Sequence, residues 1–360
     1  MKYILRAIEI TSILQSAESC VRDEGREVLH LLTDSRHATM PAESLFFAIP
    51  TQRSTGCRYV VELYGCGVRN FVVPKDAGSD YRNQFELCTE ANFWYVDDVV
   101  TALQNVAAWK RDLFDIPVVG ITGSNGKTIV KDWAVQMLSD GKKVVCNPRS
   151  YNSQIGVPLS VWQMDRGDEI GVFEAGISQK GEMERLRRVM RPTIGLLTNI
   201  GQAHDENFGS RKEKLAEKLK LFAESEVVVY CSDQTEVAEA MHDKTVLSGV
   251  RRYAWGRGDE ADLRVKEVMQ EGGGTGVKIE VGGRGGRIFI PFVDRASVEN
   301  AMQCVALMSW LGYGLDEVAQ KCLRLTAVAM RMELNEAIGG SLLVNDSYSL
   351  DLDSLEIALD

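Results

Sequence analysis

A glycine-rich loop that carries a lysine and a hydroxyl group follows a short apolar run in this chain. Residues 116–121 are rich in β-branched side chains, which is typical of a buried parallel strand. The loop's N–H groups can converge on phosphate oxygens, its lysine can reach the outer phosphates and its last hydroxyl can bind Mg²⁺. The residue types therefore predict a nucleotide phosphate site, with an ordinary glycine-rich turn as the alternative. The loop consists of Gly123, Ser124, Asn125, Gly126, Lys127 and Thr128.

An amphipathic helix is expected directly behind this loop. Apolar side chains recur at helical spacing, and Gly141 is expected to end the helix. The helix dipole and the unpaired N–H groups of its first turn both favour an anion at the loop. The recurring apolar residues are Val130, Trp133, Ala134, Met137 and Leu138.

Strand and helix signals alternate from about residue 117 to about residue 250, which predicts a mostly parallel sheet covered by helices. The strand candidates are residues 118–121, 144–146, 170–173, 194–198 and 227–231. Polar residues follow several of these strands: the loop after the first, Glu174 after the third and residues 199–204 after the fourth. Since ligands of such sheets bind at the carboxyl ends of the strands, we expect one site there.

The flanking segments carry other signals. Residues 1–95 show short strand and turn patterns that fit a small α/β domain, and Asp97 or Asp98 can cap a helix that runs to about residue 114. Residues 272–286 are rich in glycine, but no helix follows them. We therefore predict a hairpin there, and not a dinucleotide fingerprint.

Length and composition restrict the class of protein. With 360 residues the chain is long enough for two or more domains, and its hydrophobic fraction of 45% is ordinary for a globular protein. A net charge of −10 argues against general affinity for nucleic acid. Neither a signal peptide nor the roughly 20-residue apolar stretch of a membrane span is evident. Eight cysteines without a C-x-x-C pair indicate reduced thiols in a cytoplasmic protein, not disulfides or zinc.

The motif G-x-T-G-x-x-G-K-T at residues 120–128 resembles the phosphate loop of the Mur ligases, the ATP-dependent amide-forming enzymes of peptidoglycan synthesis. The D-S-R segment at 34–36, followed by L-F-F-A-I at 45–49, is similar to the UDP-binding domain of the members that add D-alanyl-D-alanine. Five further blocks follow in the family's order. They are Y-N-S-Q-I-G-V-P at 151–158, F-E-A-G at 173–176, T-N-I-G-Q-A-H at 198–204, S-V-E-N-A at 297–301 and N-D-S-Y at 345–348.

The resemblance implies a role for each matching residue. Catalytic roles fall to Lys127, Glu174, His204 and Lys218. ATP would be bound by the loop residues 123–128 together with Asn300, Arg331, Asp346 and Tyr348. Two Mg²⁺ ions would be held by Thr128, Glu174, His204 and a carbamylated Lys218, and the UDP-linked substrate by Ser35, Arg36, Phe47 and Asn152. The alternatives are a capped turn with a surface arginine at 34–36, an exposed helical asparagine at 300 and a solvated lysine at 218.

The resemblance also implies a domain plan. Residues 1–95 would form a UDP-muramoyl-substrate domain, residues 96–330 a P-loop-type ATPase domain and residues 331–360 the start of a Rossmann-like third domain. The chain would then be a fragment with little or no activity of its own. Whether the whole protein is fused to an alanine racemase, as in some bacteria, stays open.

The function implied is ATP-dependent addition of D-alanyl-D-alanine to UDP-N-acetylmuramoyl-tripeptide through an acyl phosphate. Three alternatives remain. The first is a folate polyglutamate ligase of the same superfamily, and the second is a non-catalytic module that binds UDP-muramoyl peptide and ATP. A P-loop kinase or regulatory ATPase is the third.

Overall fold

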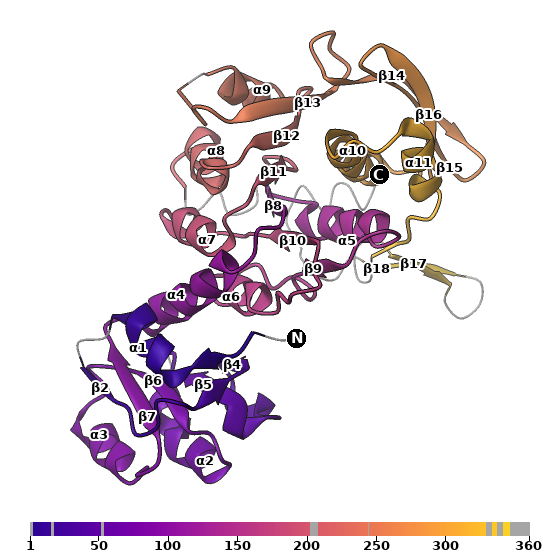
Figure 1. Cartoon of the computed structure of the whole chain (residues 1–360). Coiled ribbons are helices and arrows are strands. Elements are labelled where there is room, and N and C mark those ends of the chain that lie inside the picture. Colours follow the sequence, from indigo (N-terminus) through magenta and orange to yellow (C-terminus); the bar gives the residue numbers. More distant parts are fainter. Residues whose placement is uncertain are drawn as a thin grey trace. The chain divides into compact units, whose positions relative to one another are not determined.

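The computed structural model describes residues 3–15, 18–51, 54–201, 208–243, 245–328, 333–336 and 341–345. It has α/β architecture with mostly parallel sheets, as the sequence predicts (Figure 1). The chain divides into two units, Met1–Asp115 with Gln154–Gly167, and Ile116–Ser153 with Asp168–Asp360. No helix in the described part of the chain has the length and apolar character needed to cross a membrane. The functional division expected at residues 95 and 330 stays a prediction.

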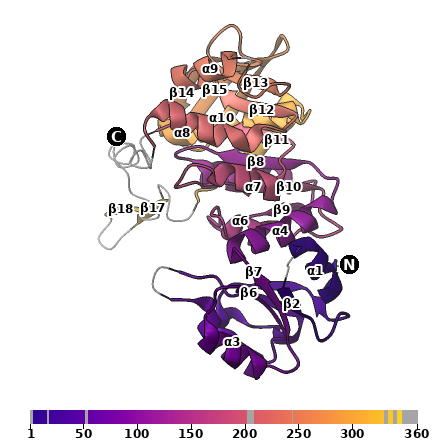
Figure 2. The ribbon, with the colours of Figure 1, turned by 90° about the vertical axis from the view of Figure 1, so that its left-hand side faces the viewer.

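The first unit is built on a five-stranded sheet in the order β2-β7-β6-β5-β4, in which β2 is antiparallel to β7 and the other neighbours are parallel. Side chains of β5 alternate between two cores: Leu45 and Phe47 pack with residues of α1 and α4, and Phe46 with residues of α2 and α3. Figures 1 and 2 show α1 and α3 on opposite sides of β6 and β7. Burial on both faces explains why β5, β6 and β7 are mostly apolar after their first residues.

The elements of the first unit are the strands β1 (Leu5–Arg6), β2 (Glu18–Cys20), β3 (Glu27–Val28), β4 (His30–Leu32), β5 (Ser44–Phe47), β6 (Asn70–Pro74) and β7 (Asn92–Val96). Its helices are α1 (Ala7–Leu14), α2 (Val60–Gly65), α3 (Ser79–Glu86), α4 (Val99–Asp112) and α6 (Gly156–Val161). The predicted helix after residue 98 is confirmed as α4, and the Asp98 side chain accepts a hydrogen bond from the Val100 N–H at 2.9 Å.

The second unit is built on a nine-stranded sheet in the order β16-β15-β14-β13-β12-β11-β8-β10-β9. The strands from β9 to β14 are parallel, and β14, β15 and β16 are antiparallel to one another. Val119 and Ile121 of β8 belong to the same core as Trp133 and Ala134 of α5. A Cβ on Gly120, between them, would instead lie 3.1 Å from Met190 Sδ of α7, so the two helices cover opposite faces.

The strands of this sheet are β8 (Val118–Thr122), β9 (Val144–Cys146), β10 (Ile170–Glu174), β11 (Ile194–Leu197), β12 (Val227–Cys231), β13 (Arg251–Gly256), β14 (Leu263–Glu271), β15 (Gly274–Val281) and β16 (Arg284–Ile290). The helices are α5 (Lys127–Leu138), α7 (Glu182–Met190), α8 (Arg211–Leu219), α9 (Thr235–His242), α10 (Arg295–Trp310) and α11 (Leu315–Cys322). A separate antiparallel pair joins β17 (Glu333–Glu336) and β18 (Leu342–Asn345). The five predicted strands and the hairpin at residues 272–286 are confirmed.

The strand order explains where a site forms. The chain leaves β8 for β9, returns to β10 beside β8, and then crosses to β11 on the other side of β8. Connections that leave β8 toward both sides of the sheet open a crevice at the carboxyl ends of the strands. The loop after β8 lies at this switch point, between the ends of β10 and β11.

Candidate active site

The loop between β8 and α5 is shaped by two glycines. Gly123 has φ +153° and Gly126 has φ +79°, which is the backbone region that side chains disfavour. A Cβ at Gly123 would lie 1.9 Å from Thr198 Oγ1, and a Cβ at Gly126 would lie 2.2 Å from Asn300 Oδ1. Both positions therefore exclude a side chain. The same geometry brings the side chain of Asn300 of α10 to the loop, and its expected place near the adenine stays a prediction.

The segment after β11 holds the loop in place. The Ser124 N–H donates to the Asn199 carbonyl at 2.8 Å, and the Asn125 N–H donates to Asn199 Oδ1 at 2.9 Å. Thr198 Oγ1 donates to the Asn125 carbonyl at 2.7 Å. The loop conformation is thus fixed by hydrogen bonds from a neighbouring strand end, and not by its own residues alone.

Two lysine amines converge on one carbonyl group of the loop. Lys127 Nζ donates to the Gly123 carbonyl at 3.0 Å and to the Ser124 carbonyl at 2.8 Å, and Lys218 Nζ reaches the Gly123 carbonyl from α8 at 2.8 Å. Burial, followed by the nearby charges of Lys127 and Lys214, holds the pKa of Lys218 well below its usual range. The charge of Lys127 favours an anion at the loop, whereas the lowered pKa favours the neutral form of Lys218.

Glu174 ends β10, and its register partner on β8 is Ile121, one residue before that strand ends. Its side chain is fully buried, and Oε1 accepts a hydrogen bond from Asn152 Nδ2 at 3.0 Å. Thr128 Oγ1, at the start of α5, lies 2.9 Å from Ser150 Oγ. Asn152, which the resemblance assigns to the substrate, therefore contacts Glu174, which it assigns to Mg²⁺.

Two residues that the motif comparison did not single out support this arrangement. Lys131 is fully buried, and its Nζ donates to the Asn147 carbonyl at 3.0 Å and to the Arg149 carbonyl at 2.5 Å. Asn147 Oδ1 accepts from the Glu174 N–H at 2.6 Å, and its Nδ2 donates to the Tyr151 carbonyl at 2.7 Å. The sequence signal for Lys131 is its place beside the apolar stripe of the predicted helix, because a buried charge there needs a hydrogen-bond partner.

The residues present fit a nucleotide with Mg²⁺. The loop precedes the first turn of α5, where backbone N–H groups and the helix dipole favour phosphate oxygens. Mg²⁺ is typically held by one or two carboxylates together with phosphates and water, and Glu174 and the Thr128 hydroxyl are ligands of that type. Within the described ranges, no group of three or more His, Cys, Asp or Glu side chains could hold a metal by itself.

The substrate residues predicted near the N-terminus lie in the first unit. The Arg36 side chain is 82% exposed, and its guanidinium bonds the Asp34 carboxylate, with Nε 2.9 Å from Oδ1. Hydrogen bonds from Arg36 hold the pKa of Asp34 well below its usual range. Ser35 begins the same short helical turn, whereas Phe47 is fully buried in β5. The segment therefore has the form of a capped turn with a surface arginine.

Several predicted site residues lie outside the residues that the structure describes. They are His204, Arg331, Asp346 and Tyr348. Their roles stay predictions.

Comparisons with known proteins agree with the motifs. Residues 121–308 match the Mur ligase middle domain. Over 336 residues the chain is 30% identical to a UDP-N-acetylmuramoyl-tripeptide–D-alanyl-D-alanine ligase of Bacillus subtilis, covering 92% of this chain and 70% of that protein. Two solved structures share the fold. MurF from Acinetobacter baumannii has a TM-score of 0.85 at 21% identity, over 99% of this chain and 76% of that one. MurF from Thermotoga maritima in complex with ADP has a TM-score of 0.77 at 23% identity, over 92% and 73%.

Proposed function

The chain belongs to the Mur ligase family. We propose that it catalyses the ATP-dependent addition of D-alanyl-D-alanine to UDP-N-acetylmuramoyl-tripeptide. This reaction would serve peptidoglycan synthesis in the cytoplasm. The observation that supports this most directly is the loop of residues 123–128, on which Lys127 and Lys218 converge. We call the loop of residues 123–128, together with Lys218, the cradle. It suits phosphoryl transfer, in which positioning and charge stabilisation supply most of the catalysis.

The reaction has two steps. A terminal carboxylate oxygen of the tripeptide attacks the γ-phosphorus of ATP, the bond to the β-phosphate oxygen breaks, and ADP leaves. The amine of D-alanyl-D-alanine then attacks the carbonyl carbon of the acyl phosphate. Inorganic phosphate leaves, the nitrogen loses a proton, and an amide bond remains.

We assign the residues of the cradle to the first step. Lys127 and the loop N–H groups other than those of Ser124 and Asn125, which donate to Asn199, would hold the β- and γ-phosphates. Asn300 would lie near the adenine. When bound, Mg²⁺ would neutralise the charge that develops on the phosphates. Thr128 and Glu174 would hold one ion, and His204 with Lys218 a second.

Other residues would bind the remaining parts of the two substrates. Arg331, Asp346 and Tyr348 would complete the nucleotide site from the third domain. The UDP-binding domain of residues 1–95 would include Ser35, Arg36 and Phe47. The cradle would belong to the central domain of residues 96–330. Asn152 is proposed to orient Glu174 as well as to serve the substrate, since its amide bonds that carboxylate.

Lys218 is proposed to act as a carbamate. A neutral amine is the form that reacts with CO₂, and the buried position of Lys218 beside other cations favours that form. The product carries two oxygens suited to a hard cation. With ¹³C-bicarbonate we expect a carbamate signal in the NMR spectrum that Lys218→Ala removes. The matched control is Lys212→Ala, an exposed lysine of the same helix, which should keep the signal.

A ligand comparison tests the proposed activity. We expect UDP-N-acetylmuramoyl-tripeptide to raise the thermal midpoint of the chain, and UDP-glucose and folate to have little effect. Stabilisation by folate alone would instead support the folate polyglutamate ligase. Phosphate release that needs both the tripeptide and D-alanyl-D-alanine would separate a ligase from a binding module. ATP turnover that is indifferent to both would indicate a kinase or regulatory ATPase.

A further inference from the structure

A turn after β9 contacts both the start of α5 and the end of β10, the two places that carry the expected ligands of one Mg²⁺ ion. It consists of residues 147–152, and we call it the β9 turn. Toward α5, Ser150 Oγ lies 2.9 Å from the Thr128 hydroxyl. Toward β10, Asn152 Nδ2 donates to Glu174 Oε1 at 3.0 Å. One short segment therefore contacts both side chains.

The β9 turn is joined to the end of β10 through backbone groups as well as side chains. Asn147 is buried, its Oδ1 accepts from the Glu174 N–H at 2.6 Å and its Nδ2 donates to the Glu174 carbonyl at 3.4 Å. The Gly176 N–H donates to the Asn152 carbonyl at 2.9 Å. A Cβ on Gly176 would lie 3.1 Å from the Asn152 side chain, so the two segments are in close contact. A shift of the turn would therefore also move Glu174.

The amine of Lys131 holds the β9 turn against α5. Lys131 follows Thr128 by three residues, so the two side chains lie on the same face of that helix. Its Nζ donates to the Asn147 carbonyl at 3.0 Å and to the Arg149 carbonyl at 2.5 Å, which are the start and the middle of the turn. Asp132 Oδ1 lies 3.0 Å from the same nitrogen. The three N–H groups of a lysine ammonium thus have three acceptors.

The backbone of the turn needs this support. Arg149 has φ 50°, which is the left-handed region that a residue with a side chain adopts at a cost. Such backbone persists where the surrounding contacts fix it. Lys131 supplies a contact at the strained residue itself, because it bonds the Arg149 carbonyl. Loss of the amine would let the turn relax.

We propose that Lys131 is a positioning residue for Mg²⁺: its amine fixes the β9 turn, and the turn orients the Thr128 hydroxyl and the Glu174 carboxylate. The inference rests on the proposed function, in which those two side chains hold one ion. It separates the roles of two lysines of α5. Lys127 bonds the loop and would serve the phosphates, whereas Lys131 bonds the turn and serves the metal ligands.

ATP binding with and without the metal tests the proposal on the whole 360-residue chain. Isothermal titration calorimetry gives the Kd of ATP in EDTA and in saturating Mg²⁺, and we call the ratio of the two the metal gain. Lys131→Met keeps an unbranched side chain and deletes the amine. It should lower the metal gain about ten-fold, the loss typical when an outer partner of a metal ligand is removed. The Kd in EDTA should stay nearly unchanged, because the loop and Lys127 are intact.

Three further variants make the test specific. Lys321→Met is the matched control: Lys321 is also a buried lysine of the second unit, but it pairs with Asp140 and Glu317, each at 3.6 Å, and should keep the full metal gain. Lys131→Gln retains N–H donors without the charge and should lower the gain several-fold. It is the deciding variant if Lys131→Met does not fold, which circular dichroism checks. Ser150→Ala, at a half-buried position, deletes the hydroxyl beside Thr128 and should also lower the gain several-fold.

Hydrogen exchange measured without nucleotide gives a second readout. Lys131→Met should speed exchange at residues 147–152 and 174–176, which the turn joins, and Lys321→Met should not. Equal exchange in these segments for Lys131→Met and the unsubstituted chain would overturn the proposal, since the amine would then not hold the turn.

The binding measurements separate failure of this inference from failure of the proposed function. An unchanged metal gain in Lys131→Met or Lys131→Gln, or an equal loss in Lys321→Met, overturns the inference alone. A loss of affinity in EDTA as large as the loss in Mg²⁺ also overturns it, because Lys131 would then support the loop or the fold in general. If the ATP affinity of the unsubstituted chain does not respond to Mg²⁺, the proposed function itself is rejected.

Discussion

The convergence of two lysines on the Gly123 carbonyl is the feature of individual residues that most constrains the site. Lys127 and Lys218 approach the same oxygen from α5 and from α8, and Lys214 bonds the Gly201 carbonyl nearby. Like charges held close together in a buried place destabilise one another. The lowered pKa of Lys218 relieves that repulsion because it favours the neutral amine, the form from which the proposed carbamate is made.

Lys127→Ala should weaken Mg·ATP binding by at least ten-fold, because the variant loses a charge-assisted hydrogen bond to phosphate. The fold should be retained, since the Lys127 amine bonds loop carbonyls and belongs to no apolar core. Isothermal titration calorimetry measures the affinity, and Lys142→Ala, a lysine beyond the end of α5, is the control. An unchanged affinity would contradict the assignment of this loop to ATP.

Lys218→Met should make the protein more stable near neutral pH by about 1 to 3 kcal/mol, because it replaces a buried amine with an apolar side chain of similar length. The pKa of Lys218 lies below its unfolded value, so the unfolded chain binds more protons over that interval. The stability of the unsubstituted protein therefore rises with pH, and the advantage of Lys218→Met should shrink as the pH approaches 10.5. Urea unfolding at several pH values measures this, and an advantage that grows with pH would contradict it.

At the scale of elements, the loop after β8 and the segment after β11 form one interlocked structure. Gly126 lies so close to Asn300 that α10 also depends on the absence of a side chain there. Gly126→Ala should therefore destabilise the fold by on the order of 1 to 3 kcal/mol and weaken Mg·ATP binding as well. Gly141→Ala is the control, because a Cβ there would meet no described atom within 4 Å. Equal stability of the two variants would show that the loop tolerates a shift.

The strands and the loop were predictable because both depend on local sequence. The β-branched run before Gly123 and the alternation of strands with helices predict β8, α5 and the site at the carboxyl ends of the strands. The support around Glu174 was not predictable in the same way. Asn147 and Lys131 act through hydrogen bonds between segments that meet only after the sheet forms, and a lone asparagine or lysine carries no sign of such a partner.

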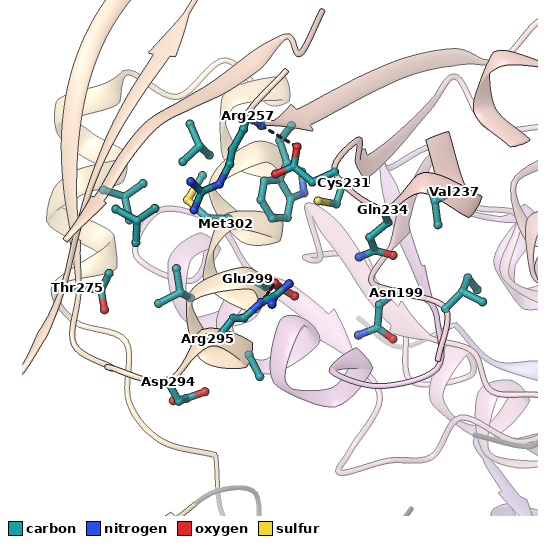
Figure 3. Close-up of a pocket in the computed structure, with 18 of the residues that line it drawn as sticks. Asn199, Cys231, Gln234, Val237, Arg257, Thr275, Asp294, Arg295, Glu299 and Met302 are labelled. Carbon is teal, nitrogen blue, oxygen red and sulfur yellow. Dashed lines mark hydrogen bonds and ion pairs between the residues drawn. The ribbon is translucent and has the colours of Figure 1, made fainter. Parts of the chain in front are cut away.

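The edge of the sheet shows a similar limit. The glycines at 272–286 indicated a hairpin, but not that β14, β15 and β16 extend the parallel sheet of the second unit. Nor did the sequence indicate the pocket of the second unit that Figure 3 shows, because its wall brings α10 together with β12, β13, β14, β15 and α9. Pairing between distant strands depends on packing partners that periodicity alone does not identify.

At the scale of the whole molecule, the chain is two units whose segments are interleaved. The first unit also includes residues Gln154–Gly167 from the middle of the chain. Within this unit, Trp162 Nε1 donates a hydrogen bond to the Leu29 carbonyl at 2.9 Å. Each unit has its own apolar core. The two proposed ligands would therefore act on different parts of the chain, the UDP-linked peptide on the first unit and ATP on the second.

Hydrogen exchange measured by mass spectrometry should separate these two effects. Mg·ATP should protect residues 120–130 and 211–219, because phosphate contacts would order the loop and the helix that carries Lys218. UDP-N-acetylmuramoyl-tripeptide should protect residues 30–48, which contain the D-S-R turn and β5. Lys127→Ala should lose the protection by Mg·ATP and retain the protection by the UDP-linked peptide. Protection of residues 30–48 by Mg·ATP alone, with none at 120–130, would reverse the assignment of the two units and reject the proposed division of labour between them.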